Sequence, residues 1–488
     1  MSDEPKQRSM VDRVLGIFTE VHSGEGFLAL SMALLVFLLL TAYYLIKPVR
    51  EALILQQGGA VAKSYLSAVM AVLLFFLVQG YSKLVSRYER TRLITVVTSV
   101  FIACLVGFWI LSRLNVPYLG YVFFVWVGIF SVMVVAQFWS YANDVYDQEA
   151  GKRLFPIVGF GGAFGAFAGA DIADRMMEYV NVYEMLLLAA ALLAICIIIT
   201  NLISLKVWGR QQIRVSQSSL EDWLGDRKAR REKEKLAFGL LLEHRYLTYI
   251  ALLVFTLNTV NTTGEYILGD LVGDFGQSQV EAAVSEATAE GTELRFGDRD
   301  LGDPQSEEAQ NAFVQSTIGS FYADFFRWVN LLGMFLQLFV VSRIVKFLGI
   351  KAGLLWLPIM ALGTYGLIVF LPILKFVRIG KTLENASDYS INKTTLHMLF
   401  LPTSRDVKYK AKQAIDSFFH RLGDVGSAVI VFFGVTLLHL DARGMAVINI
   451  LLILGWFFLI RGIVREHREI EAGNRPELTG EAAEELVA

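Results

Sequence analysis

The chain has 488 residues, of which 55% are hydrophobic and only 18% are charged, and its formal net charge is -2. This composition is typical of an integral membrane protein and excludes an ordinary soluble domain. Two cysteines, Cys104 and Cys196, are too few for a disulfide or metal framework, and the six histidines show no metal-ligand spacing. No catalytic constellation is present, so we expect neither an enzyme nor a cofactor, metal or nucleic-acid partner.

Twelve stretches are long enough to cross a membrane, because about 20 helical residues span the hydrocarbon layer. The tenth of them is too polar for hydropathy alone to identify it. The first six expected spans are 26–46, 64–84, 93–112, 118–142, 155–174 and 185–205. The second six are 246–269, 317–342, 351–371, 373–400, 416–438 and 444–463. The sequence therefore predicts an all-α fold of two six-helix bundles, covering residues 26–205 and 246–463.

A charged linker, residues 206–245, separates the two bundles. Lysine and arginine favour cytoplasmic loops, and those of this chain fall on one side if the terminal segments 1–25 and 464–488 are both cytoplasmic. The loop 270–316 carries eleven acidic residues and is then external. The sequence leaves its order open, although low hydrophobicity and high charge favour disorder.

The two halves echo each other in short strings that occur in the same order. The matches are Ser82-Lys83-Leu84-Val85 with Ser342-Arg343-Ile344-Val345, and Glu51-Ala52-Leu53-Ile54 with Glu265-Tyr266-Ile267-Leu268. Such duplication favours a major-facilitator-like architecture, in which two bundles rock about a central site. A monomer is the expected state for this architecture.

The first expected span ends in a polar cluster formed by Tyr44, Lys47, Arg50 and Glu51. Its two cations are suited to holding an anionic group, the arginine through two hydrogen bonds and the lysine as a mobile charge. Glu51 is the expected ion-pair partner. Equally, these side chains could anchor the helix at the membrane surface.

The seventh and eighth spans are also polar. We expect Asn258 and Asn261 to bind substrate or to bond neighbouring helices. Glu265 would pair with a cation or carry a proton. Asp324 and Arg327, three residues apart, would form either a static ion pair or one that opens to bind substrate.

The tenth expected span, between Pro372 and Pro402, carries a row of charges that must face water, a ligand or one another. At helical spacing one face holds Lys375, Arg378, Lys381, Asn385, Asp388 and Asn392, and Lys393 follows. This stripe indicates a polar translocation path.

Glycines recur every four residues in the fifth span, at Gly161, Gly165 and Gly169. Small residues at this spacing let helices approach closely. No phosphate-binding loop signature follows them, so we interpret the row as a packing face.

Three stretches resemble the ATP/ADP translocases of plastids and obligate intracellular bacteria. They are Ile46–Glu51, the segment from Phe138-Trp139-Ser140 to Gly159-Phe160-Gly161, and the segment from Asp388-Tyr389-Ser390 to Leu422-Gly423. The resemblance implies a transporter of an anionic substrate that is related to nucleotide exchangers, and Lys47, Arg50 and Glu265 carry over as residues of its substrate region. The chain departs from the family at two places. Pro48 replaces the first acid of the family's string at the end of the first span, and Lys393–His397 stand where the family usually has an aspartate-proline and then a lysine-glutamate pair.

We therefore predict a secondary carrier that exchanges a nucleotide or a related phosphorylated anion by alternating access, in a bacterial or plastid-type inner membrane. The alternative is a proton-coupled carrier of peptides, amino-acid-like solutes or drugs. A third possibility, a non-transporting protein that binds a partner through 270–316, does not explain the charged tenth span.

Overall fold

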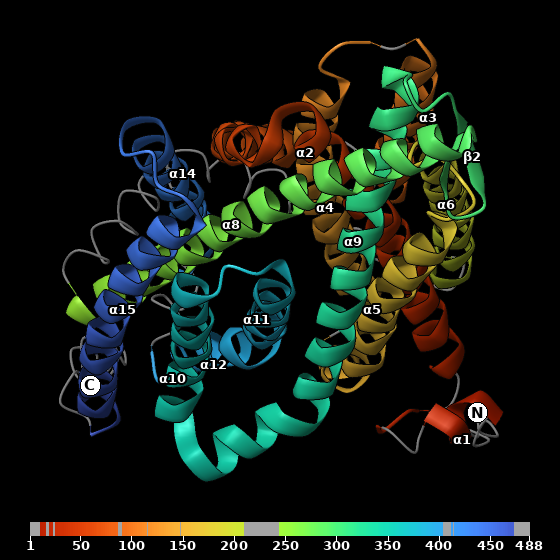
Figure 1. The fold of residues 1–488 in the computed structure, drawn as a ribbon. Helices are drawn as coiled ribbons and strands as arrows, with labels where there is room; N and C mark the ends of the chain where they lie inside the picture. The colour runs from red at the N-terminus through yellow and green to blue at the C-terminus, as the bar shows by residue number, and fades with distance from the viewer. Residues whose placement is uncertain are drawn as a thin grey trace, which may run out of the picture. The chain divides into compact units, whose positions relative to one another are not determined.

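The computed structural model describes residues 10–15, 19–22, 25–85, 90–114, 116–146, 148–208, 244–403, 411–412 and 414–472. Most of the expected linker 206–245 and much of the two terminal segments lie outside these residues. Figure 1 shows the elements. The first are α1 (Met10–Leu15), α2 (Gly26–Val85), α3 (Arg90–Arg113), α4 (Leu119–Val145), α5 (Gln148–Met176) and α6 (Glu184–Trp208). Then come α8 (Arg245–Glu290), β1 (Leu294–Phe296), β2 (Arg299–Gly302), α9 (Glu307–Phe335), η1 (Leu336–Val340) and α10 (Val341–Phe370). The last are α11 (Leu374–Ser387), η2 (Asp388–Asn392), α12 (Lys393–Met398), η3 (Ile415–Phe419), α14 (His420–Val431), η4 (Phe432–Leu437) and α15 (Ala442–Glu471).

Eight helical stretches of the described chain are long and apolar enough to cross a membrane. Two of them, Gly26–Leu74 and Glu307–Phe370, contain a glycine outside the helical conformation. Gly59 has φ 65° and Gly349 has φ 74°, values that favour glycine because a Cβ is strained there. Each break falls between two expected spans, whereas α8 and α11 are not among the eight stretches. Twelve spans therefore remains a prediction.

The helices pack into two compact units. Unit 1 comprises residues 1–59, 72–213 and 272–331, and unit 2 comprises residues 60–71, 214–271 and 332–488. Unit 1 contains most of the first expected bundle together with the end of α8 and most of α9. Its apolar core joins α2, α3, α4, α5 and α6 through fully buried side chains such as Leu45 and Phe123.

The glycine row of α5 packs against the backbone of α2. A Cβ at Gly161, Gly165 or Gly169 would stand 2.3 to 2.5 Å from a carbonyl oxygen of α2, which is closer than real Cβ contacts come. At Gly165 that oxygen belongs to Phe37. The structure confirms the predicted packing face, because only glycine lets the two helices approach this closely.

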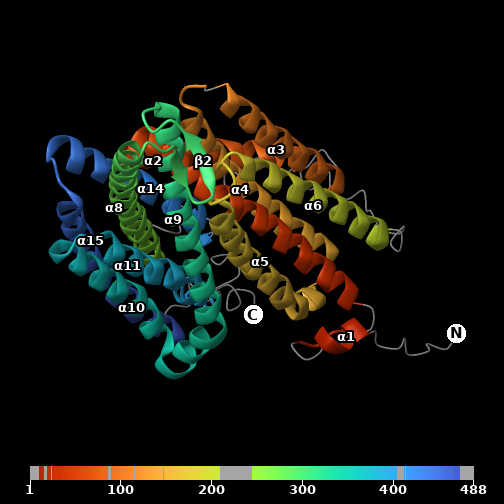
Figure 2. The same cartoon turned by 45° about the vertical axis from the view of Figure 1, so that its right-hand side comes forward.

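An ion pair joins the residue just before α2 to the beginning of α5. Figure 2 shows the two helices. Arg153 donates from Nη1 and Nη2 to the two carboxylate oxygens of Glu25, each at 2.9 Å. Asp12 of α1, which is buried, accepts a hydrogen bond from the backbone N–H of Gly26 at 2.9 Å. The hydrogen bond from Gly26 thereby holds α1 at the beginning of α2.

We expect Glu25→Gln to remove part of the acid sensitivity of the protein. The hydrogen bonds from Arg153 hold the pKa of the Glu25 carboxyl below its usual range. The pKa of Glu25 is lower in the folded protein than in the unfolded chain. The ion pair therefore stabilises the folded protein at pH values above the unfolded pKa of about 4.3, and this stabilisation is lost as the pH falls through the folded-state pKa. The free energies of unfolding of wild type and variant, measured by denaturation, should differ by on the order of 1 kcal/mol at neutral pH and converge in acid. Glu290→Gln, at the exposed end of α8, is the control; a constant difference down to low pH would contradict the assignment.

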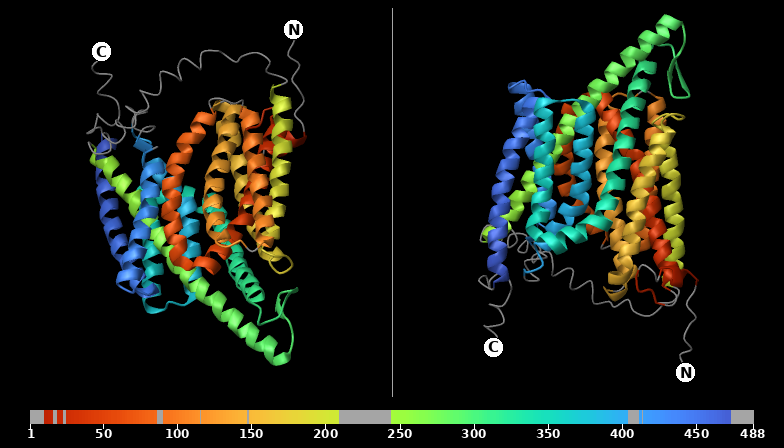
Figure 3. Two further views of the ribbon diagram at one scale, coloured as in Figure 1. Left: turned by 90° about the horizontal axis from the view of Figure 1, so that it is seen from above. Right: turned by 60° about the horizontal axis from the view of Figure 1, so that its bottom comes forward.

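The acidic segment 270–316 is ordered, although its composition favours disorder. Helix α8 continues through it to Glu290 and leads into an antiparallel hairpin, β1–β2, before α9 begins (Figure 3). Val272, Val280 and Ala287 on one face of α8 are buried. Arg299 anchors the hairpin by donating to the carbonyl oxygen of Val180 and to Ser316 Oγ, both at 3.0 Å.

Candidate functional site

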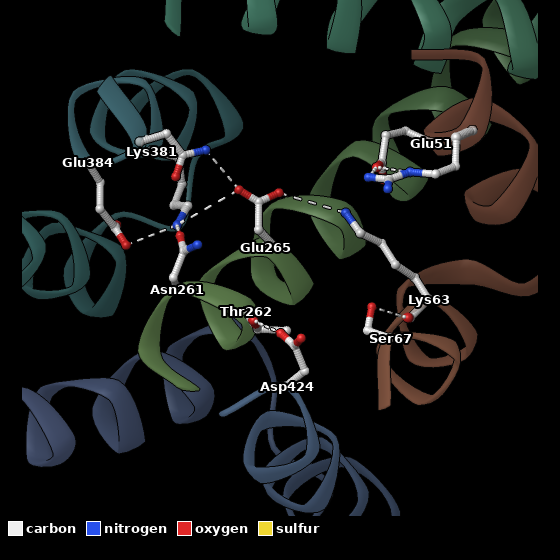
Figure 4. A network of polar contacts seen from close by, with 11 residues as sticks. Glu51, Lys63, Ser67, Asn261, Thr262, Glu265, Lys381, Glu384 and Asp424 are labelled. Carbon is white, nitrogen blue, oxygen red and sulfur yellow. Dashed lines mark hydrogen bonds and ion pairs between the residues drawn. The ribbon is translucent and has the colours of Figure 1, made fainter. Parts of the chain in front are cut away.

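Glu265 lies at the centre of a charged network in unit 2 (Figure 4). Its Oε2 is 3.8 Å from Lys63 Nζ, on the part of α2 that follows Gly59. Its Oε1 is 4.0 Å from Lys381 Nζ and accepts a hydrogen bond from Asn385 Nδ2 at 3.0 Å. Two helices, α2 and α11, therefore direct polar groups at the carboxylate that α8 carries.

Lys381 is the most deeply buried cation of this network, with none of its side chain exposed. Its Nζ lies 3.0 Å from Asn261 Oδ1 and 3.0 Å from Glu384 Oε1. Glu384 is itself buried, and the hydroxyl of Tyr365 on α10 donates to its Oε1 at 3.4 Å. A lysine and a glutamate thus neutralise each other inside a helix bundle, which makes their burial tolerable.

Gly264 makes room for this arrangement. A Cβ at this position would stand 2.0 Å from the hydroxyl of Tyr365 and 2.9 Å from Lys381 Nζ. The residue before Glu265 must therefore lack a side chain if Tyr365 and Lys381 are to reach the network. The site therefore depends both on the glycine next to Glu265 in the sequence and on the packing of α10 and α11 against it.

Asn258 lies one turn before Asn261 on α8 but bonds a different helix. Its Nδ2 donates to Asp424 Oδ1 at 2.8 Å and to the carbonyl oxygen of His420 at 2.7 Å. Thr262 Oγ1 donates to the same Asp424 oxygen at 2.9 Å. These contacts hold α8 against α14, and a substrate contact by Asn258 remains a prediction.

The stripe of the tenth expected span is divided by its secondary structure. Asp388 to Asn392 form the π-helical turn η2, in which Asn392 Nδ2 donates to Asp388 Oδ1 at 2.7 Å. Lys375 and Lys393 are exposed, and Arg378 is half-buried. Two residues of this stripe, Lys381 and Asn385, bond to the network around Glu265. A π turn changes the angular spacing of side chains, so a strict helical period does not place the far end of the stripe.

In unit 1, Lys47 is buried in an aromatic cage. Its Nζ lies 3.8 Å from the ring centre of Phe326 and 5.0 Å from that of Tyr44. The rings stabilise the ammonium group through their negative faces. Tyr44, whose ring packs edge-on against Phe326, joins the predicted cluster of α2 to α9.

Arg50 and Glu51 form an ion pair in the same part of α2. The Arg50 guanidinium donates to Glu51 Oε1 from both Nε and Nη2. It also lies 4.9 Å from the ring centre of Phe124 on α4. Neither side chain is at an exposed surface position, since 14% of the Arg50 side chain and 2% of the Glu51 side chain are accessible.

Arg327 contacts three carboxylates in unit 1. It pairs with Asp324 on its own helix, and its Nη1 lies 2.6 Å from Asp174 Oδ2 and 3.5 Å from Asp171 Oδ1 on α5. The pair expected within α9 therefore extends to a neighbouring helix. Whether Arg327 binds substrate and Asp324 acts in gating remain predictions.

Sequence reasoning missed several members of these networks. Lys63 is a single cation at the start of an apolar span, and this position is the only feature of the sequence that points to a functional role for it. Glu384 follows Lys381 by three residues, a spacing that allows an ion pair. Asp171 and Asp174 have no local pattern that points to Arg327, because the contact joins helices far apart in sequence.

Comparison with known proteins places the chain in a family. A sequence profile described as TLC ATP/ADP transporter matches residues 4–119, 114–266 and 350–467. The ADP,ATP carrier protein 1 of Chlamydia trachomatis serovar D is 21% identical over 339 aligned residues, which cover 62% of this chain and 55% of that relative. This chain thus spans about half of the length of that carrier. The ADP,ATP carrier protein 1 of Rickettsia bellii is 21% identical over 517 aligned residues, covering 95% and 98%.

Solved structures with the same fold include the crystal structure of the nucleoside transporter NupG. It aligns with a TM-score of 0.55 at 10% identity and covers 90% of this chain and 98% of its own. At this identity the likeness concerns the fold alone, and it confirms the predicted all-α, major-facilitator-like architecture. Because the profile matches along most of the sequence, the chain belongs to the TLC ATP/ADP transporter family.

Proposed function

We propose that this protein is a secondary carrier that exchanges a nucleotide, or a closely related phosphorylated anion, across a membrane by alternating access. The family assignment and the carrier relatives support a transporter rather than an enzyme. We further propose that it acts as a monomer with both termini in the cytoplasm, in a bacterial or plastid-type inner membrane.

One observation carries the choice of substrate class. Lys63 and Lys381, from different helices, converge on the single carboxylate of Glu265. A phosphate chain with several negative charges can replace that carboxylate at both ammonium groups, whereas a neutral solute cannot. Glu265 retains 22% of its side-chain exposure, so it can be hydrated when the lysines turn to the substrate.

The test is ligand-induced thermal stabilisation of the purified protein with ATP, ADP, AMP, inorganic phosphate, amino acids and peptides. We expect ATP and ADP to raise the melting temperature. Lys63→Gln should weaken nucleotide affinity by about tenfold to a hundredfold, because one charge-assisted contact is worth about 1.5–3 kcal/mol. Lys351→Gln removes an exposed lysine of α10 and should leave the shift unchanged.

Two results would contradict the proposal in different ways. Equal nucleotide shifts in Lys63→Gln and the wild type would remove Lys63 from the substrate site. No shift with any nucleotide, together with a shift from amino acids or peptides, would replace the exchanger by the proton-coupled carrier.

A further inference from the structure

Glu384 differs from every other acid of the network in its burial and its bonding. The residue is 3% exposed, and its Oε1 accepts from Lys381 Nζ at 3.0 Å and from Tyr365 at 3.4 Å. Its second oxygen, Oε2, is buried and has no hydrogen-bond partner among the described residues. A buried carboxylate oxygen without a donor is unfavourable unless it acquires one.

The charged groups around Glu384 come from several packed elements. The only cation within ion-pair distance of Glu384 among the described residues is Lys381. Lys63 is not within ion-pair distance of Glu384 and contacts Glu265 instead. The titratable groups that face Glu384 are Lys381 on α11, Tyr365 on α10, Glu265 on α8 and Asp388 on η2. The ionised state of Glu384 therefore depends on one lysine.

That lysine cannot serve an anionic substrate and Glu384 equally well. An ammonium group has three N–H donors. In Lys381 this group already lies against Asn261 Oδ1, Glu384 Oε1 and Glu265 Oε1. A phosphate group that binds Lys381 must draw it from Glu384. A buried carboxylate left without its counter-ion becomes neutral by binding a proton, since the isolated charge is far more costly.

Glu265 would respond differently to the same event. It is partly exposed and keeps the amide of Asn385 as a donor. Hydration can therefore compensate Glu265, whereas Glu384 is only 3% exposed and has too little accessible surface to be hydrated in the same way.

We propose that the binding of an anionic substrate at Lys381 is coupled to the uptake of one proton by Glu384, at Oε2. The proton enters from the aqueous side to which the site is open, and it leaves when the substrate departs and Lys381 returns to Glu384. This inference rests on the proposed function, because it requires an anion to reach Lys381. In this proposal Glu384 positions Lys381 and also binds one proton for each anion that binds.

Calorimetric titration of the detergent-purified protein with ATP and with ADP tests the coupling. Titrations in two buffers of different ionisation enthalpy measure the protons taken up per nucleotide bound. Between pH 7.5 and 8.5 the terminal phosphate is ionised, because its pKa lies about 1 to 2 units lower. We expect the wild type to take up close to one proton more than Glu384→Gln. Because binding consumes a proton, wild-type affinity should fall up to about tenfold per pH unit, while that of Glu384→Gln stays nearly constant.

A matched control is Asp424→Asn, since Asp424 is a buried acid of the same unit that bonds Asn258 and Thr262 instead of Lys381. It should keep the wild-type proton count. Nucleotide binding to the wild type without proton uptake would overturn the coupling and leave the proposed function intact, even if Glu384→Gln fails to fold. Failure of both nucleotides to bind the wild type would overturn the proposed function, and this inference with it.

Discussion

Lys381→Ala is expected to abolish nucleotide exchange and to lower the free energy of unfolding by about 3–5 kcal/mol, because it leaves a buried carboxylate without its partner. Lys381 has no exposed side-chain surface and lies 3.0 Å from Glu384. The loss should be largest at high pH, where neutralising Glu384 with a proton is itself unfavourable. Transport of labelled ADP into proteoliposomes and chemical denaturation in detergent measure the two effects.

The double variant Lys381→Met with Glu384→Gln separates stability from transport. Removing both charges should restore most of the stability, because no unpaired ion remains, but it should not restore exchange. Lys375→Ala, an exposed position of α11, should change stability by no more than about 0.5 kcal/mol. Exchange at the wild-type rate by Lys381→Ala would exclude this lysine from the substrate path.

Gly165→Ala is expected to destabilise unit 1 by about 1–3 kcal/mol, the usual cost of forcing a methyl group into a packed contact. The new Cβ would stand 2.3 Å from the carbonyl oxygen and 2.8 Å from the Cα of Phe37. Both are backbone atoms of α2, so neither can rotate away, and the helices must separate. The melting temperature in detergent measures the loss.

Gly159→Ala is the matched control in the same helix. Apart from the local backbone of α5 itself, no atom lies within 4 Å of its would-be Cβ, and alanine favours a helix over glycine by about 1 kcal/mol. This variant should be as stable as the wild type or slightly more so. Similar losses in both variants would show that helix propensity, and not the contact with α2, governs the row.

The sequence predicted the parts of the fold that depend on local periodicity. The polar face of α11 and the glycine row of α5 both follow from residue spacing, and the structure places Lys381 and Gly165 in buried contacts. The acidic segment shows the limit of composition. Val272, Val280 and Ala287 keep a helical spacing within it, and this pattern, together with the long-range anchor of Arg299, outweighs the high charge.

The candidate site was predictable only in part, for a physical reason. Glu265 and Lys381 stand out because each is a charge within an expected membrane span, where burial demands a partner. The identity of that partner depends on which helices meet. Lys63 is 202 positions from Glu265 along the chain, and no spacing rule connects them.

The hairpin β1–β2 has a practical consequence for imaging this protein. The hairpin is exposed at Asp298 in its turn and at Asp300 in β2, while Gly297 packs on Glu178 and Arg299 fixes the hairpin to unit 1. An antibody fragment that recognises the turn would therefore be attached without a flexible joint. Bound there, it would supply the rigid external mass needed to align single particles of a small carrier in the electron microscope.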